Sequence, residues 1–224
     1  SALRLRCLGR AAHATLPGLG INALGRLCLC LGAALDPGDP LGDFAAFLGR
    51  SFGTDSTGAS LGLAGRHPHL GDVTVNLATL EREGDELVFR LGIYVPADTL
   101  PFPRVRRTLE ELFAPQGIRL VVDREVPPLL VPPEAPLIRK LRSAYHRATG
   151  ESPRLLGMCG STYAKGMPNL VPFGVTFSDE PDFAHGADER VALHRLRRSV
   201  SILTWALEEL GCRREPAPFP ADPR

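Results

Sequence analysis

The chain has 224 residues, of which 44% are hydrophobic and 23% are charged, and its formal net charge is +1. This composition is that of an ordinary globular protein and excludes the disordered and fibrous classes. Because 26 basic residues are balanced by 25 acidic residues spread along the chain, we expect no nucleic-acid partner and no binding to an anionic membrane.

The cysteines and the apolar runs bear on the compartment. The five cysteines, at positions 7, 28, 30, 159 and 212, have no metal-type spacing, which favours small buried side chains in a reducing, cytoplasmic compartment. The longest early apolar run, Leu27 to Leu35, is far shorter than the roughly 20 residues of a membrane helix. We recognise no signal peptide, and the initial Ser suggests that an N-terminal portion is missing.

The first half of the chain alternates between strand and helix patterns. Positions that alternate apolar and polar predict strands, and apolar positions three and four apart predict helices. Strands are expected at 2–8, 73–81, 86–95 and 118–122, and helices at 21–35 and 105–113, with a shorter helical pattern at 44–52. Glu83, Gly84 and Asp85 predict the turn of a hairpin. The order is that of a small βαββαβ sandwich, an α+β unit.

A proline-rich run, Val126 to Ala135, marks the best domain boundary. We therefore expect one domain over 1–125, a second part over 126–212 and a frayed tail over 213–224. The second part is expected to hold a helix at 136–149, a buried strand at 170–177, and a helix from an Asp188 N-cap to Leu210.

Two histidines lie on glycine-containing or polar loops, where a neighbouring strand or helix can orient a ring nitrogen. His185 follows the strand predicted at 170–177, and His13 lies in the segment GRAAHATLPGLG. Either histidine could bind a metal ion or a substrate, but from the residues alone a polar turn residue is the favoured interpretation of each. Gly160, Ser161 and Thr162 form a loop whose N–H and hydroxyl groups suit an anion, although a plain turn explains them as well.

Three segments together resemble a known family. GRAAHATLPGLGINAL, GMCGSTYAKGMPN and FAHGADE are similar, in this order, to motifs of the dinuclear zinc peptidases and deacylases that include carnosinase, carboxypeptidase G and succinyl-diaminopimelate desuccinylase. The GSTYA form points to the dipeptidase V branch. The resemblance implies a lid domain followed by the C-terminal portion of a catalytic α/β domain, and therefore a C-terminal fragment of such an enzyme.

The same resemblance implies roles for individual residues. His185 corresponds to a zinc ligand, His13 to the lid histidine that polarises the scissile carbonyl, and Gly160, Ser161 and Thr162 to the loop that binds the substrate carboxylate. The implied cofactor is zinc, two ions per complete site, which activate a water for amide hydrolysis. The implied substrate is a small peptide, and the oligomeric state stays open.

Two departures from the family keep alternatives open. Tyr94 stands where the dipeptidases carry an arginine, which weakens the expectation of a C-terminal carboxylate partner. We recognise none of the N-terminal motifs of the family in the chain, neither the H-x-D ligand pair nor the bridging Asp nor the segment whose Glu-Glu supplies base and ligand, so we expect the chain alone to be inactive. The alternatives are an N-acyl amino acid deacylase or carboxypeptidase of the same family, and a non-catalytic remnant that serves as an interaction module.

Overall fold

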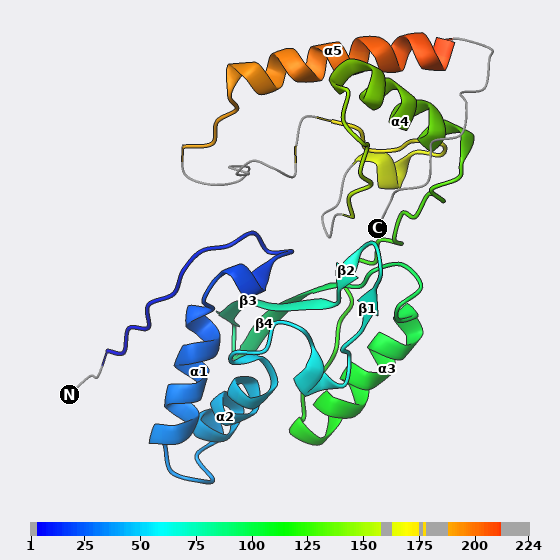
Figure 1. Ribbon diagram of the computed structural model, residues 1–224. Coiled ribbons are helices and arrows are strands. Elements are labelled where there is room, and N and C mark those ends of the chain that lie inside the picture. Colours follow the sequence, from blue (N-terminus) through cyan, green and yellow to red (C-terminus); the bar gives the residue numbers. More distant parts are fainter. Residues whose placement is uncertain (1–3, 158–162, 175–176, 178–187, 212–224) are drawn as a thin grey trace. The chain divides into compact units, whose positions relative to one another are not determined.

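The computed structural model describes residues 4–157, 163–174, 177 and 188–211, and divides into two compact units (Figure 1). Unit 1 comprises the described residues up to Pro128 together with Gly157, and unit 2 comprises Leu129–Leu156 and the described residues from 163 onward. Over the described residues the fold is mixed α+β, with five α-helices and two small antiparallel sheets.

A β-hairpin is the centre of unit 1. Strands β3 (Thr74–Glu83) and β4 (Glu86–Tyr94) are antiparallel, with Glu83 opposite Glu86, so that Gly84 and Asp85 form the turn as predicted. Gly84 has a φ of 63°, which a glycine adopts without strain. A second short pair, β1 (Arg66–His67) and β2 (Gly71–Asp72), was not predicted.

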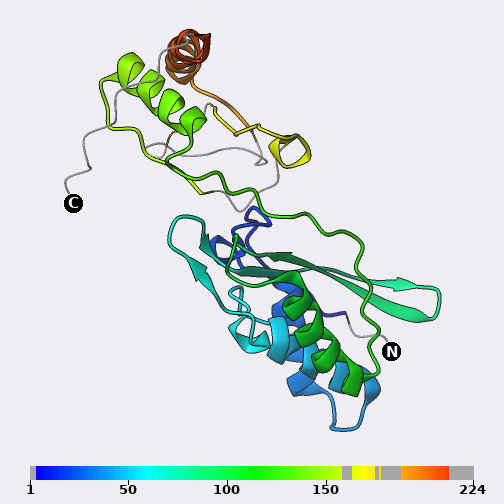
Figure 2. The ribbon, with the colours of Figure 1, turned by 90° about the vertical axis from the view of Figure 1, so that its right-hand side faces the viewer.

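Three helices pack against one face of the hairpin, as Figure 2 shows for unit 1. Helix α1 (Ala23–Ala34) begins at the N-cap Asn22, and α2 (Pro40–Phe52) begins at the N-cap Asp39 with Pro40 in its first turn. Both begin as helix-capping rules predict. Helix α3 (Phe102–Phe113) follows the hairpin. The helices predicted at 21–35 and 105–113 are thereby confirmed, and the 44–52 pattern is part of a longer helix.

The core of unit 1 lies between these helices and β3. Alternate β3 residues Val75 and Leu77 are 3% exposed, and they pack with buried residues of α2 and α3 such as Leu48 and Phe113. On α1, Cys28 is buried whereas Cys30 is exposed, so the expectation of buried cysteines fails for Cys30. Gly32 lets α1 approach α2, because an added Cβ would lie 2.5 Å from the Cα of Ala46.

Two strands predicted for unit 1 are wrong over the described residues. Residues 4–8 and 118–122 are not in strands. Close to the first of these segments, Arg10 and Ile21 form a single isolated antiparallel bridge. Leu5 and Leu8 are exposed, as are Val121 and Val122. The alternation in these segments is correct for a strand, but a strand also needs a paired neighbour. The βαββαβ sheet is therefore reduced to its central hairpin.

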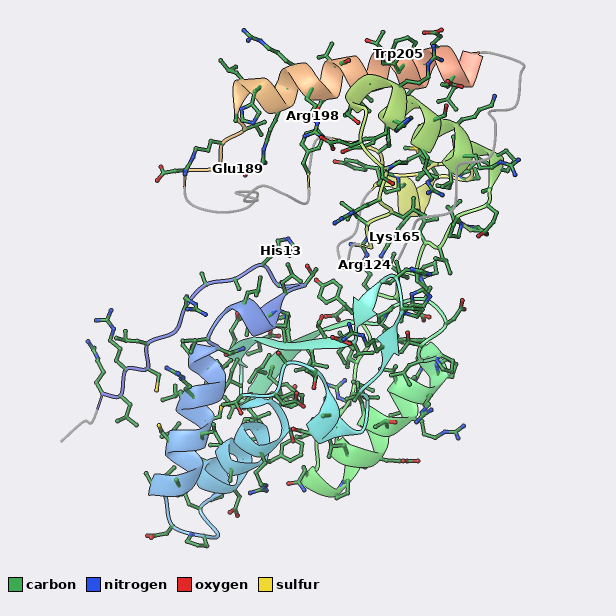
Figure 3. The ribbon with its side chains drawn as sticks, viewed as in Figure 1. His13, Arg124, Lys165, Glu189, Arg198 and Trp205 are labelled. Carbon is green, nitrogen blue, oxygen red and sulfur yellow. The ribbon has the colours of Figure 1, made fainter. Side chains whose placement is uncertain are left out.

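Unit 2 consists mainly of two packed helices. Helix α4 (Pro136–Thr149) ends at Gly150, which has a φ of 72°, as the sequence predicted. Helix α5 (Leu193–Gly211) packs against α4 through Ala206, with Trp205 partly buried beside it (Figure 3).

Arginine side chains join the two helices of unit 2. The Arg147 guanidinium lies 3.9 Å from the centre of the Trp205 ring, and its Nη1 donates to Glu209 Oε1 at 2.7 Å. Arg198 donates to Tyr145 Oη at 3.0 Å and to the Glu151 carboxylate. Each arginine lies on one helix and contacts the other. An aromatic ring and a carboxylate both contact each guanidinium, so that cation–π stacking and an ion pair together stabilise the packing of the two helices.

Two details predicted for unit 2 are also wrong. Residues 170–174 and 177 are not in a strand, and the short apolar run contributes Val171 and Phe173 to the small helix core instead. Helix α5 begins at Leu193 and not after Asp188, which has a φ of 58°. A residue in the left-handed region is not an N-cap, because N-caps have extended backbone angles.

Candidate functional site

His13 lies on a loop whose two ends are fastened together. Arg10 N donates to Ile21 O at 3.0 Å, and Ile21 N donates to Arg10 O at 2.9 Å. The Arg10 guanidinium donates to Leu19 O at 3.0 Å. Gly20 permits this closure, since an added Cβ would lie 2.7 Å from Arg10 O. The exposed His13 is therefore held on a constrained loop next to the start of α1 (Figure 3).

Thr15 fixes the tautomer of the neutral His13 ring. Its backbone N–H donates to His13 Nδ1 at 3.2 Å, and its hydroxyl lies 2.7 Å from the same nitrogen. A backbone amide can only donate, so Nδ1 accepts, and the proton of the neutral ring is on Nε2. Thr15 is itself buried, and its carbonyl accepts a hydrogen bond from Thr74 Oγ1 of β3 at 3.4 Å. Thr15 therefore fastens the histidine to the hairpin.

A cavity of about 310 Å³ opens beside this histidine, within unit 1. Its polar lining comes from four segments: Arg10 and His13 from the loop, Asn22 and Arg26 from the start of α1, Thr54, Asp55 and Ser56 from the segment after α2, and Asn76 from β3. The volume is at the lower end of the range typical of small-molecule sites. The cavity therefore suits a small polar ligand.

Asn22 joins two walls of the cavity. Its Oδ1 accepts from Gly25 N at 3.0 Å and caps α1, while its Nδ2 donates to Leu77 O at 2.8 Å and to Asn76 Oδ1 at 3.3 Å. The sequence analysis missed both asparagines. The helix start was the available signal for Asn22, because an Asn precedes the first apolar position of the 21–35 pattern. Nothing local points to Asn76.

Asp55 uses its carboxylate within its own loop. The two oxygens accept from Thr57 N at 2.8 Å, Thr57 Oγ1 at 2.7 Å and Ser60 N at 2.7 Å. Burial raises the pKa of Asp55, but the hydrogen bonds from Ser60 and Thr57 outweigh burial and hold the pKa below its ordinary value. Arg10 and Arg26 contribute positive charge to the same lining. The cavity therefore favours a ligand with a negatively charged end.

The lowered pKa of Asp55 predicts an acid-sensitive loop. The ionised carboxylate stabilises the fold fully above its ordinary pKa of 3.8, and this contribution is lost as the pH falls through the lower pKa of the folded state. Asp55→Asn should therefore be less stable than wild type at pH 6, and the difference should shrink steadily below about pH 4. Urea unfolding at pH 6, 4 and 3 measures both proteins. A difference that is independent of pH would contradict this assignment.

The other predicted site residues are distributed as follows. Gly160, Ser161, Thr162 and His185 lie outside the described residues. Tyr94 is half-buried at the end of β4, opposite Thr74, and does not line the cavity. Of the residues singled out for chemistry, the structure therefore places only His13 in a described cavity.

Neither a metal cluster nor a membrane span is present in the described part of the chain. Over these residues, no three His, Cys, Asp or Glu side chains come together in a way that could hold a metal ion. No described helix combines the length and the apolar character needed to cross a bilayer. The described residues therefore do not by themselves fit a zinc site.

Comparison with known proteins gives a consistent class. No protein-family model matches the chain. It is similar to proteins with a peptidase name: it is 30% identical over 212 residues to "Putative dipeptidase YtjP" of Bacillus subtilis (strain 168), and that match covers 93% of this chain and 44% of the relative. It is also 26% identical over 203 residues to a "Putative dipeptidase" of Staphylococcus aureus (strain USA300), covering 90% of this chain and 43% of the relative.

The homologues support a peptidase family for this chain. The chain spans less than half the length of these relatives, 43% and 44%. The activity, the substrate and the partners of a whole dipeptidase are therefore only proposals for this chain.

Proposed function

We propose that the chain is the C-terminal part of a zinc-dependent dipeptidase, with unit 1 as its lid and unit 2 as part of its catalytic domain. The observation that carries the proposal is His13, held on a constrained loop at a cavity of about 310 Å³, in a chain similar to proteins named dipeptidases. The reaction is hydrolysis of the amide bond of a dipeptide.

His13 is proposed to act on the scissile carbonyl. With Nδ1 occupied by the Thr15 amide, the neutral ring presents an N–H at Nε2 that can donate to the carbonyl oxygen. That hydrogen bond strengthens as negative charge develops on the oxygen, which is the condition for lowering the barrier. Arg10 and Arg26 supply positive charge at the same cavity, which suits a peptide with a free carboxylate.

The proposed zinc ions need ligands beyond the described residues. We propose His185 as the ligand that this chain contributes, with the others on polypeptide outside the chain. Bound zinc supplies a Lewis acid that activates water for attack. Gly160, Ser161 and Thr162 are proposed to bind the substrate carboxylate through backbone N–H and hydroxyl groups. The proposed location is the cytoplasm.

Tyr94 favours a second candidate. An arginine at its position would pair with a carboxylate through two hydrogen bonds, which a phenol cannot do. An N-acyl amino acid deacylase or carboxypeptidase of the same family is therefore the alternative enzyme. The third candidate, a non-catalytic interaction module, rests on the absence of a metal cluster from the described residues.

Zinc content and hydrolysis test the proposal together. The chain alone should bind no stoichiometric zinc and hydrolyse no dipeptide, because a catalytic zinc needs about three protein ligands. The chain mixed with the remaining part of a dipeptidase relative should bind two zinc ions, hydrolyse dipeptides, and lose both properties in His185→Ala. Preference for acyl-amino acids would select the deacylase. Zinc binding without hydrolysis of either class, or activity of the chain alone, would contradict the proposal.

A further inference from the structure

The segment of residues 7–10 lies along helix α1 (Figure 1). Arg10 and Ile21 exchange two backbone hydrogen bonds at one end of this contact. Gly9 lies so close to the helix that an added Cβ would be 2.4 Å from Ile21 O and 3.0 Å from the Cβ of Ala23. The position of this segment is therefore set by backbone contacts that involve no cysteine.

Two thiols meet at the other end of the same contact. The Cys7 side chain is half-buried, and it is hydrogen-bonded to the side chain of Cys30, which is exposed. Cys30 shares a face of α1 with Ala23 and Arg26, because helix residues three, four and seven apart lie on one side. The contact between the thiols therefore extends the line in which Gly9 meets Ala23.

A hydrogen-bonded pair of thiols is close to the arrangement of a disulfide. The two sulfurs of a disulfide are about 2.05 Å apart, so that a short approach of the side chains is sufficient. The neighbouring Cys28 is 2% exposed, and it lies on another side of α1, in the core. Among the described cysteines, Cys7 and Cys30 are therefore the two that are placed to react with each other.

We propose that Cys7 and Cys30 form a reversible disulfide when the chain meets a small-molecule disulfide, oxidised glutathione. The bond would join the N-terminal segment to α1 and would enclose the His13 loop, which the hydrogen bonds between Arg10 and Ile21 already close. In reducing compartments such disulfides are transient and serve redox sensing. The proposed site concerns thiol chemistry, so it does not depend on the hydrolysis of dipeptides.

The reaction is a thiol–disulfide exchange in two steps. Partial burial raises the pKa of the Cys7 thiol, and Cys30 raises it further, while the positive charge of Arg26 acts in the opposite direction. Cys30 is the exposed sulfur, so its thiolate attacks oxidised glutathione first, which forms a mixed disulfide and releases one glutathione thiolate. The Cys7 thiolate then attacks the Cys30 sulfur and releases the second. Two cysteine thiols are thereby oxidised, one glutathione disulfide is reduced, and the released thiolates take up the two protons.

Mass spectrometry of the complete 224-residue chain tests the pairing. The reduced chain is incubated with oxidised glutathione, remaining thiols are alkylated, and the chain is digested with trypsin. Residues 7–10 should be linked to residues 27–50, with fragmentation between Cys28 and Cys30 assigning the bond to Cys30. Reduced glutathione should reverse the linkage. Cys7→Ser should leave glutathione attached to Cys30, whereas Cys28→Ala should leave the linkage unchanged.

Oxidation in concentrated urea is the control for the fold. The five cysteines of the chain then pair without a fixed geometry, so the share of chains with the Cys7–Cys30 linkage should fall at least about fivefold. Circular dichroism of each variant without urea verifies that the chain is folded. An equal share in folded and unfolded chains would show that the packing of the segment on α1 does not direct the pairing.

Hydrogen exchange followed by NMR tests what the bond does. The amides of Arg10 and Ile21 should exchange at least about tenfold more slowly in the oxidised chain, because the covalent bond opposes local opening of the segment. Amides of β4 should exchange at unchanged rates. Thiols that stay reduced, or that couple to another cysteine or a second chain, would overturn the proposal. Unchanged exchange at Arg10 and Ile21 would overturn the role assigned to the bond.

Discussion

His13→Ala is expected to lower kcat for dipeptide hydrolysis by about 10²–10³ in the chain complemented with the remaining part of a relative, with a smaller effect on KM. The physical reason is that the Nε2–H of His13 is proposed to donate to an oxygen whose negative charge grows only as the reaction proceeds. Its loss therefore raises the barrier more than it weakens substrate binding. Steady-state kinetics on one dipeptide measure both constants.

His67 provides a matched control for this substitution. Its Nδ1 also accepts hydrogen bonds from backbone amides, those of His69 and Leu70, both at 3.1 Å. It differs from His13 in not lining the cavity. His67→Ala should leave kcat within about twofold, because His67 does not line the cavity in which the reaction is proposed to occur. Equal losses in the two variants would show that His13 acts on the loop structure and not on the reaction.

Phe113→Ala is expected to destabilise unit 1 by about 3–5 kcal/mol, which is the usual cost of removing a buried phenylalanine side chain. Phe113 is 2% exposed at the end of α3. Its ring contacts Phe47 of α2 edge-on at 6.1 Å between centroids and Phe89 of β4 at 5.6 Å. The substitution therefore leaves a cavity where α2, α3 and the hairpin meet, and it would remove a large fraction of the roughly 5–15 kcal/mol that stabilises an ordinary domain.

Chemical denaturation followed by circular dichroism measures this loss of stability. Leu87→Ala is the control, since Leu87 lies on the same hairpin and is 49% exposed. We expect it to change the free energy of unfolding by no more than about 0.5 kcal/mol. A loss below about 1 kcal/mol for Phe113→Ala would contradict its position at the centre of the core.

Local sequence signals predicted the elements whose stabilising interactions are also local. Helices α1 and α4 were predicted from apolar spacing and from their ends, and the hairpin was predicted from Gly84 and Asp85 in its turn. In each case the hydrogen bonds that define the element lie within the segment or between residues close in sequence. The candidate site was harder to predict from the sequence. His13 is the only residue of its polar lining that the sequence analysis singled out.

Strands at 2–8 and 118–122 were predicted from the local sequence pattern alone, and a strand exists only where another strand provides the pairing partner. In the structure that partner is absent for both described segments, and only Arg10 and Ile21 bridge. The predicted run at 170–177 was short and apolar, and such runs do not distinguish a buried strand from a segment that packs under helices. These outcomes depended on neighbours that no local pattern encodes.

The sequence by itself determined that helices α1, α3 and α4 exist and where the hairpin turns, and it singled out His13 and His185 for a test. Only the tertiary structure brought Asn22 to Asn76 and Leu77, with hydrogen bonds that span 54 and 55 residues of sequence, and so formed the cavity beside His13. The physical reason is range: capping, turn and helix signals act over a few residues, whereas a cavity exists only when packing of the core closes contacts between distant segments.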